Sequence, residues 1–122
     1  MIPLVVAIGG AFGALARYGV GVLLPHDANG FPWRTLLINL TGSFLLGFVY
    51  RYVDGMASAD EIHALVGVGF CGAFTTFSAF SLEAVSLIQS GHAVRAGAYV
   101  AASVALCMIG TAAGLWLGNG RL

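Results

Sequence analysis

Polar and polarisable residues recur every four positions in the last apolar stretch of the chain, at Tyr99, Ser103, Cys107 and Thr111. Residues four apart lie on one face of a helix, so this spacing predicts a single continuous stripe. Hydroxyl groups can donate hydrogen bonds to an anion, and such a stripe on an otherwise apolar helix suits a polar path. Serine and threonine also bond back to their own helix, so a structural stripe is the alternative.

A second polar pair lies in the stretch 33–53, where Asn39 and Ser43 are four residues apart and share a helix face. An asparagine in the middle of a membrane helix can hydrogen-bond a neighbouring helix. It can equally offer its NH2 group to a permeating anion. The chemistry of the residue leaves both alternatives open.

The stretch 61–89 contains three glycines, Gly67, Gly69 and Gly72, followed by two threonines. This composition is poor for a helix interior and predicts a break at about residues 72–76. Non-helical backbone is tolerated at membrane depth only when it is buried in protein or lines a cavity. Its freed carbonyl groups can coordinate a hard cation such as Na+.

Two phenylalanines, Phe77 and Phe80, follow the predicted break and share a helix face, beside a stripe formed by Ser78 and Ser81. Packing in the core is the usual role of such a pair. The edges of aromatic rings nevertheless carry partial positive charge. Ring edges beside hydroxyl donors can therefore line a path for a small, dehydrated anion.

Two ionisable residues lie within apolar stretches, Arg17 in residues 2–24 and Glu83 in residues 61–89. A charge within a span is costly unless it reaches the interface or finds a partner. Arg17 is near enough to the end of its helix to reach the interface; alternatively, it is a fixed positive charge that binds carbonyl groups or attracts anions. Glu83 is expected toward the outer end of its span, paired or hydrated.

These residues need apolar helices to position them, and the composition predicts such helices. The chain has 122 residues, of which 59% are hydrophobic and only 8% charged, whereas soluble domains carry roughly 25% charged residues. A membrane helix needs about 20 apolar residues, so we expect an all-α membrane protein with one domain, residues 1–122. The four predicted spans are residues 2–24, 33–53, 61–89 and 93–117. The net charge of zero gives no indication of nucleic-acid binding.

The arginines are balanced between the two ends of the predicted bundle. Arg51 and Arg121 lie at the end that holds the termini, and Arg34 and Arg95 lie at the opposite end. Because an arginine bias sets the orientation of a membrane protein, a balance predicts insertion in both directions. Two inverted copies can then pair as an antiparallel homodimer, which brings two sets of freed carbonyl groups together on the two-fold axis.

Three motifs follow one another along the chain. They are Gly-Gly-x-x-Gly-Ala-x-x-Arg-Tyr at 9–18, Thr-Leu-x-x-Asn-x-x-Gly-Ser-Phe-x-x-Gly at 35–47, and Gly-Phe-Cys-Gly-x-x-Thr-Thr-Phe-Ser-x-Phe-Ser-x-Glu at 69–83. Together they resemble the fluoride channel family known as Fluc or CrcB over the whole chain, and the third motif is highly specific. The chain departs from the usual pattern at Ala79 and Cys107, where relatives often carry hydroxyl residues.

The resemblance implies a dual-topology antiparallel homodimer with two pores and a central structural Na+. It also implies passive export of fluoride across the bacterial inner membrane, which lowers fluoride toxicity in the cytoplasm. Because neutral HF enters cells and dissociates inside, a channel is enough to let the anion out. The implied partners are the fluoride ion, the lipid bilayer and a second copy of this chain.

The resemblance assigns roles to individual residues as well. It implies that the backbone carbonyl groups of Gly72 and Thr75 bind the central Na+. It places Arg17 near a vestibule and Glu83 near the end of the pore. The implied fluoride path comprises Asn39, Phe77, Ser78, Phe80, Ser81, Tyr99, Ser103 and Thr111.

Two other functions are possible alternatives for a small membrane protein of this kind. A small multidrug transporter is also a four-helix dual-topology dimer, but its chemistry needs a carboxylate in the first span, where this chain has Arg17. A purely structural assembly subunit would not require a broken third span or aligned polar stripes. No nucleophile–base pair or metal-ligand constellation in the sequence indicates an enzyme.

Overall fold

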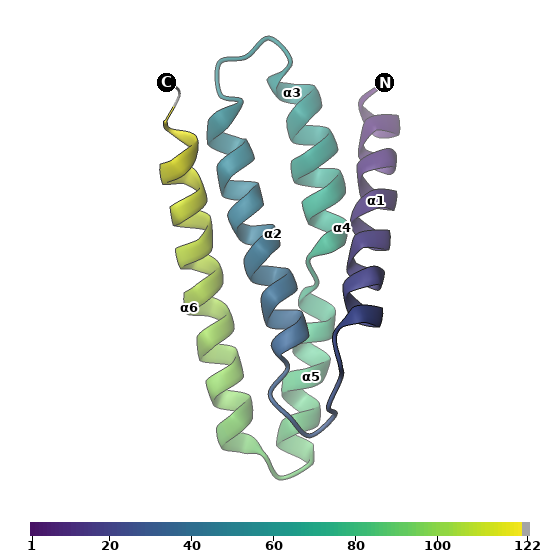
Figure 1. Ribbon diagram of the computed structural model, residues 1–122, viewed down its shortest axis with the longest axis vertical. Coiled ribbons are helices and arrows are strands. Elements are labelled where there is room, and N and C mark those ends of the chain that lie inside the picture. Colours follow the sequence, from purple (N-terminus) through teal and green to yellow (C-terminus); the bar gives the residue numbers. More distant parts are fainter. Residues whose placement is uncertain (121–122) are drawn as a thin grey trace.

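The computed structural model describes residues 1–120 of the chain, and helices make up almost all of them. The elements are α1 (Ile2–Leu23), α2 (Trp33–Tyr52), α3 (Ala59–Ile62), the π-helix η1 (His63–Cys71), α4 (Gly72–Phe74), α5 (Phe77–Gln89) and α6 (Ala93–Gly118). Figure 1 shows α1, α2, α6 and the run from α3 to α5 side by side, with both ends of the chain at one end of the bundle. No strand occurs within residues 1–120, so the all-α prediction is confirmed.

Three helical segments are long and apolar enough to cross a membrane, at Ile2–Leu23, Ala59–Gln89 and Ala93–Gly118. We call Ala59–Gln89 the third span. The sequence predicted four spans, and α2 is the one that does not reach this level of hydropathy. Its apolar residues are interrupted by polar ones such as Asn39, and an arginine lies near each of its ends. It nevertheless runs beside α6 along most of its length (Figure 1).

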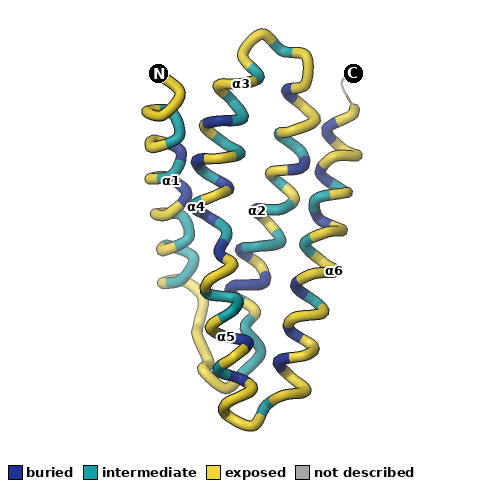
Figure 2. Tube along the Cα trace, turned by 180° about the vertical axis from the view of Figure 1, so that it is seen from behind, coloured by how far each residue is buried: buried dark blue, intermediate teal, exposed yellow. Residues whose placement is uncertain are grey.

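Glycines allow the helices to pack with their backbones in contact. A Cβ atom on Gly13 of α1 would collide with the backbone of Phe70 in η1. Likewise, a Cβ atom on Gly114 of α6 would collide with the carbonyl oxygen of Phe44 in α2. In lipid, where no hydrophobic force drives helices together, such close approach supplies the packing energy. Figure 2 shows the buried positions of α6 along the side that faces α2.

The third span changes backbone conformation at two threonines. Helix α4 ends at Phe74, and Thr75 (φ −76°, ψ 159°) and Thr76 (φ −151°, ψ 110°) are extended before α5 begins at Phe77. The side chain of Thr76 caps α5 by accepting a hydrogen bond of 3.2 Å from the amide of Ala79. This cap supplies a partner that the first turn of a helix otherwise lacks.

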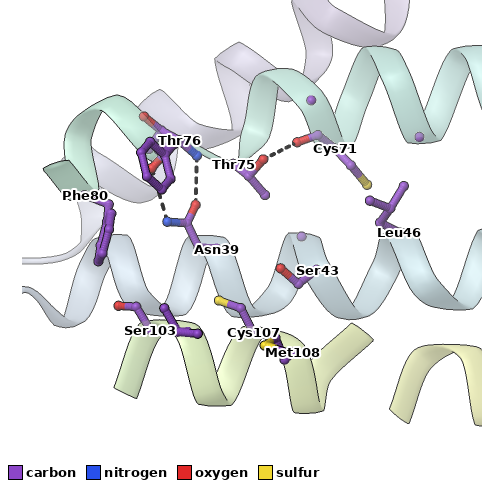
Figure 3. Close-up of a pocket in the computed structure, with 15 residues that line it drawn as sticks. Asn39, Ser43, Leu46, Cys71, Thr75, Thr76, Phe80, Ser103, Cys107 and Met108 are labelled. Carbon is purple, nitrogen blue, oxygen red and sulfur yellow. Dashed lines mark hydrogen bonds between the residues drawn. The ribbon is translucent and has the colours of Figure 1, made fainter. Parts of the chain in front are cut away.

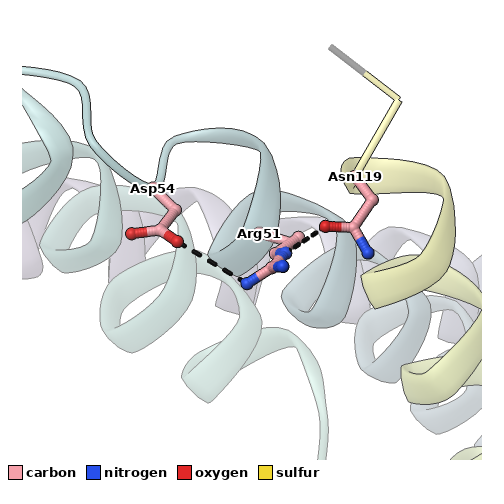
Figure 4. Close-up of polar contacts among 3 residues, drawn as sticks. All are labelled: Arg51, Asp54 and Asn119. Atoms are coloured by element: carbon pink, nitrogen blue, oxygen red, sulfur yellow. Dashed lines mark hydrogen bonds and ion pairs between the residues drawn. The ribbon is translucent and has the colours of Figure 1, made fainter.

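Arginines fasten the ends of the bundle. Arg51 lies 3.6 Å from the carboxylate of Asp54 and also donates a hydrogen bond to the side chain of Asn119, which joins the end of α2 to that of α6 (Figure 4). At the opposite end, Arg34 donates to the carbonyl oxygen of Gly21 (3.1 Å). Arg95 there contacts the loop before α2 through the carbonyl oxygen of Asn29. Arg121, which entered the predicted arginine balance, lies outside the described residues.

Candidate functional site

A cavity of about 390 Å³ lies between α2, α6 and the junction of α4 with α5. We call it the polar cavity. None of the residues around it carries a formal charge; hydrogen-bonding side chains and sulfur atoms line it together with apolar groups (Figure 3). Its polar lining residues are Asn39, Ser43, Thr75, Thr76 and Ser103, and its sulfur-containing ones are Cys71, Cys107 and Met108.

Asn39 and Thr76 are joined by two reciprocal hydrogen bonds (Figure 3). The amide of Thr76 donates to Oδ1 of Asn39 over 2.8 Å, and Nδ2 of Asn39 donates to the carbonyl oxygen of Thr76 over 3.2 Å. An asparagine NH2 group has two hydrogens, so one hydrogen remains beside the polar cavity. The two alternatives for Asn39, a contact with a neighbouring segment and a donor for an anion, are therefore compatible.

Ser103 has a buried hydroxyl group that faces this cavity. The residue is only 6% exposed, and its Oγ has no hydrogen-bond partner among the described residues. Leaving a buried hydroxyl unpaired is unfavourable, so such a group favours binding of a water molecule or an ion. Its position makes Ser103 a candidate donor to whatever enters the cavity.

The predicted stripe on α6 does not act as one unit. Ser103 and Cys107 line the polar cavity, whereas Tyr99 and Thr111 do not. The hydroxyl of Thr111 is directed to two carbonyl oxygens, those of Cys107 (3.1 Å) and Ser43 (3.3 Å). The back-bonding alternative therefore describes Thr111.

A second cavity, of about 400 Å³, lies between α1, α2 and α5. We call it the charged cavity. It contains two arginines, Arg17 and Arg34, and one carboxylate, Glu83. Arg34 is tied to the end of α1, but Arg17 makes no hydrogen bond or ion pair with another described residue. A half-buried cation that is not paired by any described residue creates a positive potential that attracts anions.

Glu83 is held by two hydroxyl donors from different helices. Thr35 of α2 donates to its Oε1 over 2.6 Å, and Tyr99 of α6 donates to its Oε2 over 2.8 Å. Tyr99 is completely buried and packs on the ring of Phe80, with the ring centroids 5.2 Å apart. The carboxylate is paired, as expected, and it joins three helices beside the charged cavity.

The residues of the predicted aromatic pair are in contact with each other. The ring centroids of Phe77 and Phe80 are 5.4 Å apart, with the rings tilted by 49°, and both residues line the polar cavity. Phe77 is 78% exposed, whereas Phe80 is partly buried against Tyr99. Of the adjoining serines, Ser78 contacts the Thr76 hydroxyl over 3.2 Å, whereas Ser81 lines neither cavity.

The backbone at the junction offers oxygen donors for a hard cation. In a continuous helix the amide of Thr76 would donate to the carbonyl oxygen of Gly72, and that of Ala79 to the carbonyl oxygen of Thr75. Here those amides donate to the side chains of Asn39 and Thr76 instead. Both Gly72 and Thr75 line the polar cavity, and carbonyl oxygens suit Na+. The donor set therefore fits this ion, although one chain supplies only part of a coordination shell.

Residues 4–115 match the protein family described as CrcB-like protein, Camphor Resistance (CrcB). The chain belongs to this family. It is 47% identical over 114 residues to a protein of Hahella chejuensis, a match that covers 92% of this chain and 90% of that protein. It is also 43% identical over 116 residues to a protein of Rhizobium meliloti, covering 93% of each. Both are named "Fluoride-specific ion channel FluC". The apolar helices and this membership make the chain an integral, multi-pass membrane protein.

In this CrcB-family chain, the sequence did not predict the contacts made by Thr35 and Thr76. Thr35 lies four residues before Asn39, as Ser43 lies four residues after it, so the helix spacing placed all three on one face. Thr76 directly precedes the residues of α5, which is a preferred position for a capping threonine. Both signals were available, but their partners depend on how the helices pack.

Proposed function

We propose that this protein is a fluoride-selective channel that passively exports F− across the bacterial inner membrane and so lowers fluoride toxicity. It is a channel and not an enzyme, in keeping with its family. The names of its relatives support this proposal. The observation that carries it is the uncharged cavity with the unpartnered Ser103 hydroxyl and the remaining Asn39 hydrogen on its walls.

Fluoride is small and strongly hydrated, so a pore must replace its water molecules with hydrogen-bond donors at each step. Arg17 attracts the anion into the charged cavity, where the hydroxyls held by Glu83 lie close by. Asn39 and Ser103 then act as donors in the polar cavity. The edges of the Phe77 and Phe80 rings complete the lining, since ring edges carry partial positive charge. Ser78 adds a hydroxyl beside the junction. Ser81 and Thr111 line neither cavity, so they support the pathway through their places in α5 and α6 and not as donors.

Two antiparallel copies form the working channel, with two pores and a structural Na+ between them. Phe77 and Met108 are 78% and 68% exposed at the mouth of the polar cavity, and a second copy would cover such apolar groups. The carbonyl groups of Gly72 and Thr75 from each copy would together hold the Na+. The ion would offset the repulsion between the carbonyl oxygens that the two copies bring together. We expect dimers purified without Na+ to dissociate at a lower temperature than dimers purified with it.

Cells provide a direct test of export. A bacterium that lacks its own fluoride exporter should resist fluoride and hold less of it when it expresses this chain. Phe77→Ile should abolish that protection while leaving the dimer intact, because isoleucine lacks a ring edge but still offers an apolar side chain for the second copy to cover. Phe12→Ile on α1 is the matched control, since Phe12 is also exposed but lines neither cavity. Protection that persists in the Phe77→Ile variant would contradict the proposed pathway.

A further inference from the structure

Thr76 alone, among the described residues, lines both the polar cavity and the charged cavity. It is 8% exposed and lies at the extended junction before α5. An ion that passes from the arginines to Asn39 and Ser103 must therefore pass this residue. The contacts of Thr76 determine what it can offer to such an ion.

The backbone of Thr76 has no free hydrogen-bond donor for an ion. Its amide hydrogen and its carbonyl oxygen are both engaged by Asn39, over 2.8 and 3.2 Å. These two bonds also hold the residue at a fixed distance from α2 (Figure 3). The side-chain hydroxyl is the remaining polar group that can interact with an ion.

The hydroxyl contacts leave a donor hydrogen free. Oγ1 accepts a hydrogen bond from the amide of Ala79 over 3.2 Å and lies 3.2 Å from Oγ of Ser78. A hydroxyl has one hydrogen to donate and two lone pairs that accept. When Ser78 is the donor of that pair, the two lone pairs of Thr76 are filled and its hydrogen is available. When the hydrogen bond reverses, Thr76 donates its hydrogen to Ser78, and that hydrogen is then not available to an ion.

We propose that the Thr76 hydroxyl is the donor that passes fluoride between the two cavities, and that it donates to Ser78 when no anion is present. The inference rests on the proposed function and assigns it a residue at the position that the two cavities share. Ala79, which carries no donor in its side chain, lines the charged cavity next to Thr76. The hydroxyl of Thr76 therefore has no substitute from that neighbour.

The competing explanation is that Thr76 only caps α5. A cap needs an oxygen acceptor, whereas passage of an anion needs a hydrogen donor. Thr76→Ser keeps both properties, and Thr76→Val removes both with little change of shape. Thr76→Gly removes the hydroxyl and adds no charge, while glycine is a tolerated N-cap residue that costs the helix little.

Fluoride efflux from proteoliposomes containing each purified variant tests the proposal, with dimer formation checked by size-exclusion chromatography. Thr76→Ser should conduct within about threefold of the unchanged chain, whereas Thr76→Val and Thr76→Gly should conduct at least about tenfold less, the loss expected when an ion loses one charge-assisted hydrogen bond. If Thr76→Val does not form dimers, the uncharged Thr76→Gly variant, in which α5 can still begin normally, provides the result. Fast efflux through whichever of these two variants is dimeric would overturn the proposal.

The unchanged chain in the same vesicles separates this inference from the function on which it rests. If it shows no fluoride efflux, the channel function itself is wrong, and the role of Thr76 falls with it. If it conducts and the Thr76→Val dimer conducts equally, only the role of Thr76 is wrong. Ser78→Ala should reduce efflux by less than Thr76→Val, because Ser78 supports the donor and does not replace it.

Discussion

The two halves of the third span are held in place by different interactions. Its first half, η1, packs on α1 with backbone against backbone, at glycines such as Gly13 and Gly69. Its second half begins at Thr75 and is held by side-chain hydrogen bonds, in which Asn39 binds Thr76 and Glu83 accepts from two helices. Within this span the charged cavity borders the second half alone, and the polar cavity is lined by side chains of the second half and by Gly67, Cys71 and Gly72 at the end of the first. The difference indicates that substitutions in the first half should damage folding and those in the second half should damage conduction.

Adding a methyl group at Gly13 should have the largest effect. The new Cβ atom would collide with the backbone of Phe70, which cannot move aside as a side chain can. We expect Gly13→Ala to lower the stability of the protomer by about 2–4 kcal/mol, as overpacking and strain do. Unfolding in detergent, followed by circular dichroism, measures this loss. Gly19→Ala on the same helix is the control, because no atom lies within 4 Å of the Cβ position there. Equal stability of the two variants would refute the glycine packing.

Replacing Asn39 by alanine should come next and should affect both stability and conduction. The change leaves the amide and the carbonyl group of Thr76 without partners, at a cost of roughly 2–3 kcal/mol for two such groups. It also removes a proposed donor, so fluoride efflux should fall by at least about tenfold. Thr41→Ala is a matched control two residues away on α2, since Thr41 is exposed and lines neither cavity. If both variants lose efflux equally, the pair of Asn39 with Thr76 has no special role.

Ser103→Ala should separate the effect on stability from the effect on conduction. The hydroxyl has no partner within residues 1–120, so its removal should leave the stability unchanged or raise it by up to about 1 kcal/mol. The same change should slow fluoride efflux by about tenfold, because an ion in the cavity would lose one donor. A variant that is destabilised and conducts normally would invert this prediction, and would mean that Ser103 serves the fold alone.

Thr111→Val should have the smallest effect of the series. Its hydroxyl donates to carbonyl oxygens and lines neither cavity, so stability should fall by no more than about 1 kcal/mol. Efflux should stay within about twofold of that of the unchanged chain. A loss of efflux as large as that of Ser103→Ala would show that the path extends along the whole stripe on α6.

The apolar stretches and the turn residues between them were enough to predict an all-α bundle. Hydropathy alone would have omitted α2, because Asn39 and its neighbours lower it, although α2 packs along α6. In the second half of the third span, Glu83 was expected to be either paired or hydrated. Sequence spacing could not identify them as Thr35 and Tyr99, since these lie 48 and 16 residues away in the chain.

The stripe on α6 also shows that spacing alone does not identify the partners of a residue. Its four members share a face by spacing, yet Tyr99 binds Glu83, Thr111 binds carbonyl groups, and only Ser103 and Cys107 line the polar cavity. Spacing places residues on a face, but the neighbouring helix determines which of them are paired. The unpaired hydroxyl of Ser103 became visible only once α2 and α5 were in place.

The most direct test of the channel function is simultaneous measurement of fluoride and chloride efflux from proteoliposomes that contain the unchanged chain alone. A membrane potential set by K+ and valinomycin drives both anions equally. We predict rapid loss of fluoride with chloride retained, because the donor-lined cavities replace the hydration shell of the smaller ion. No fluoride efflux, or chloride efflux at the same rate, would contradict the account.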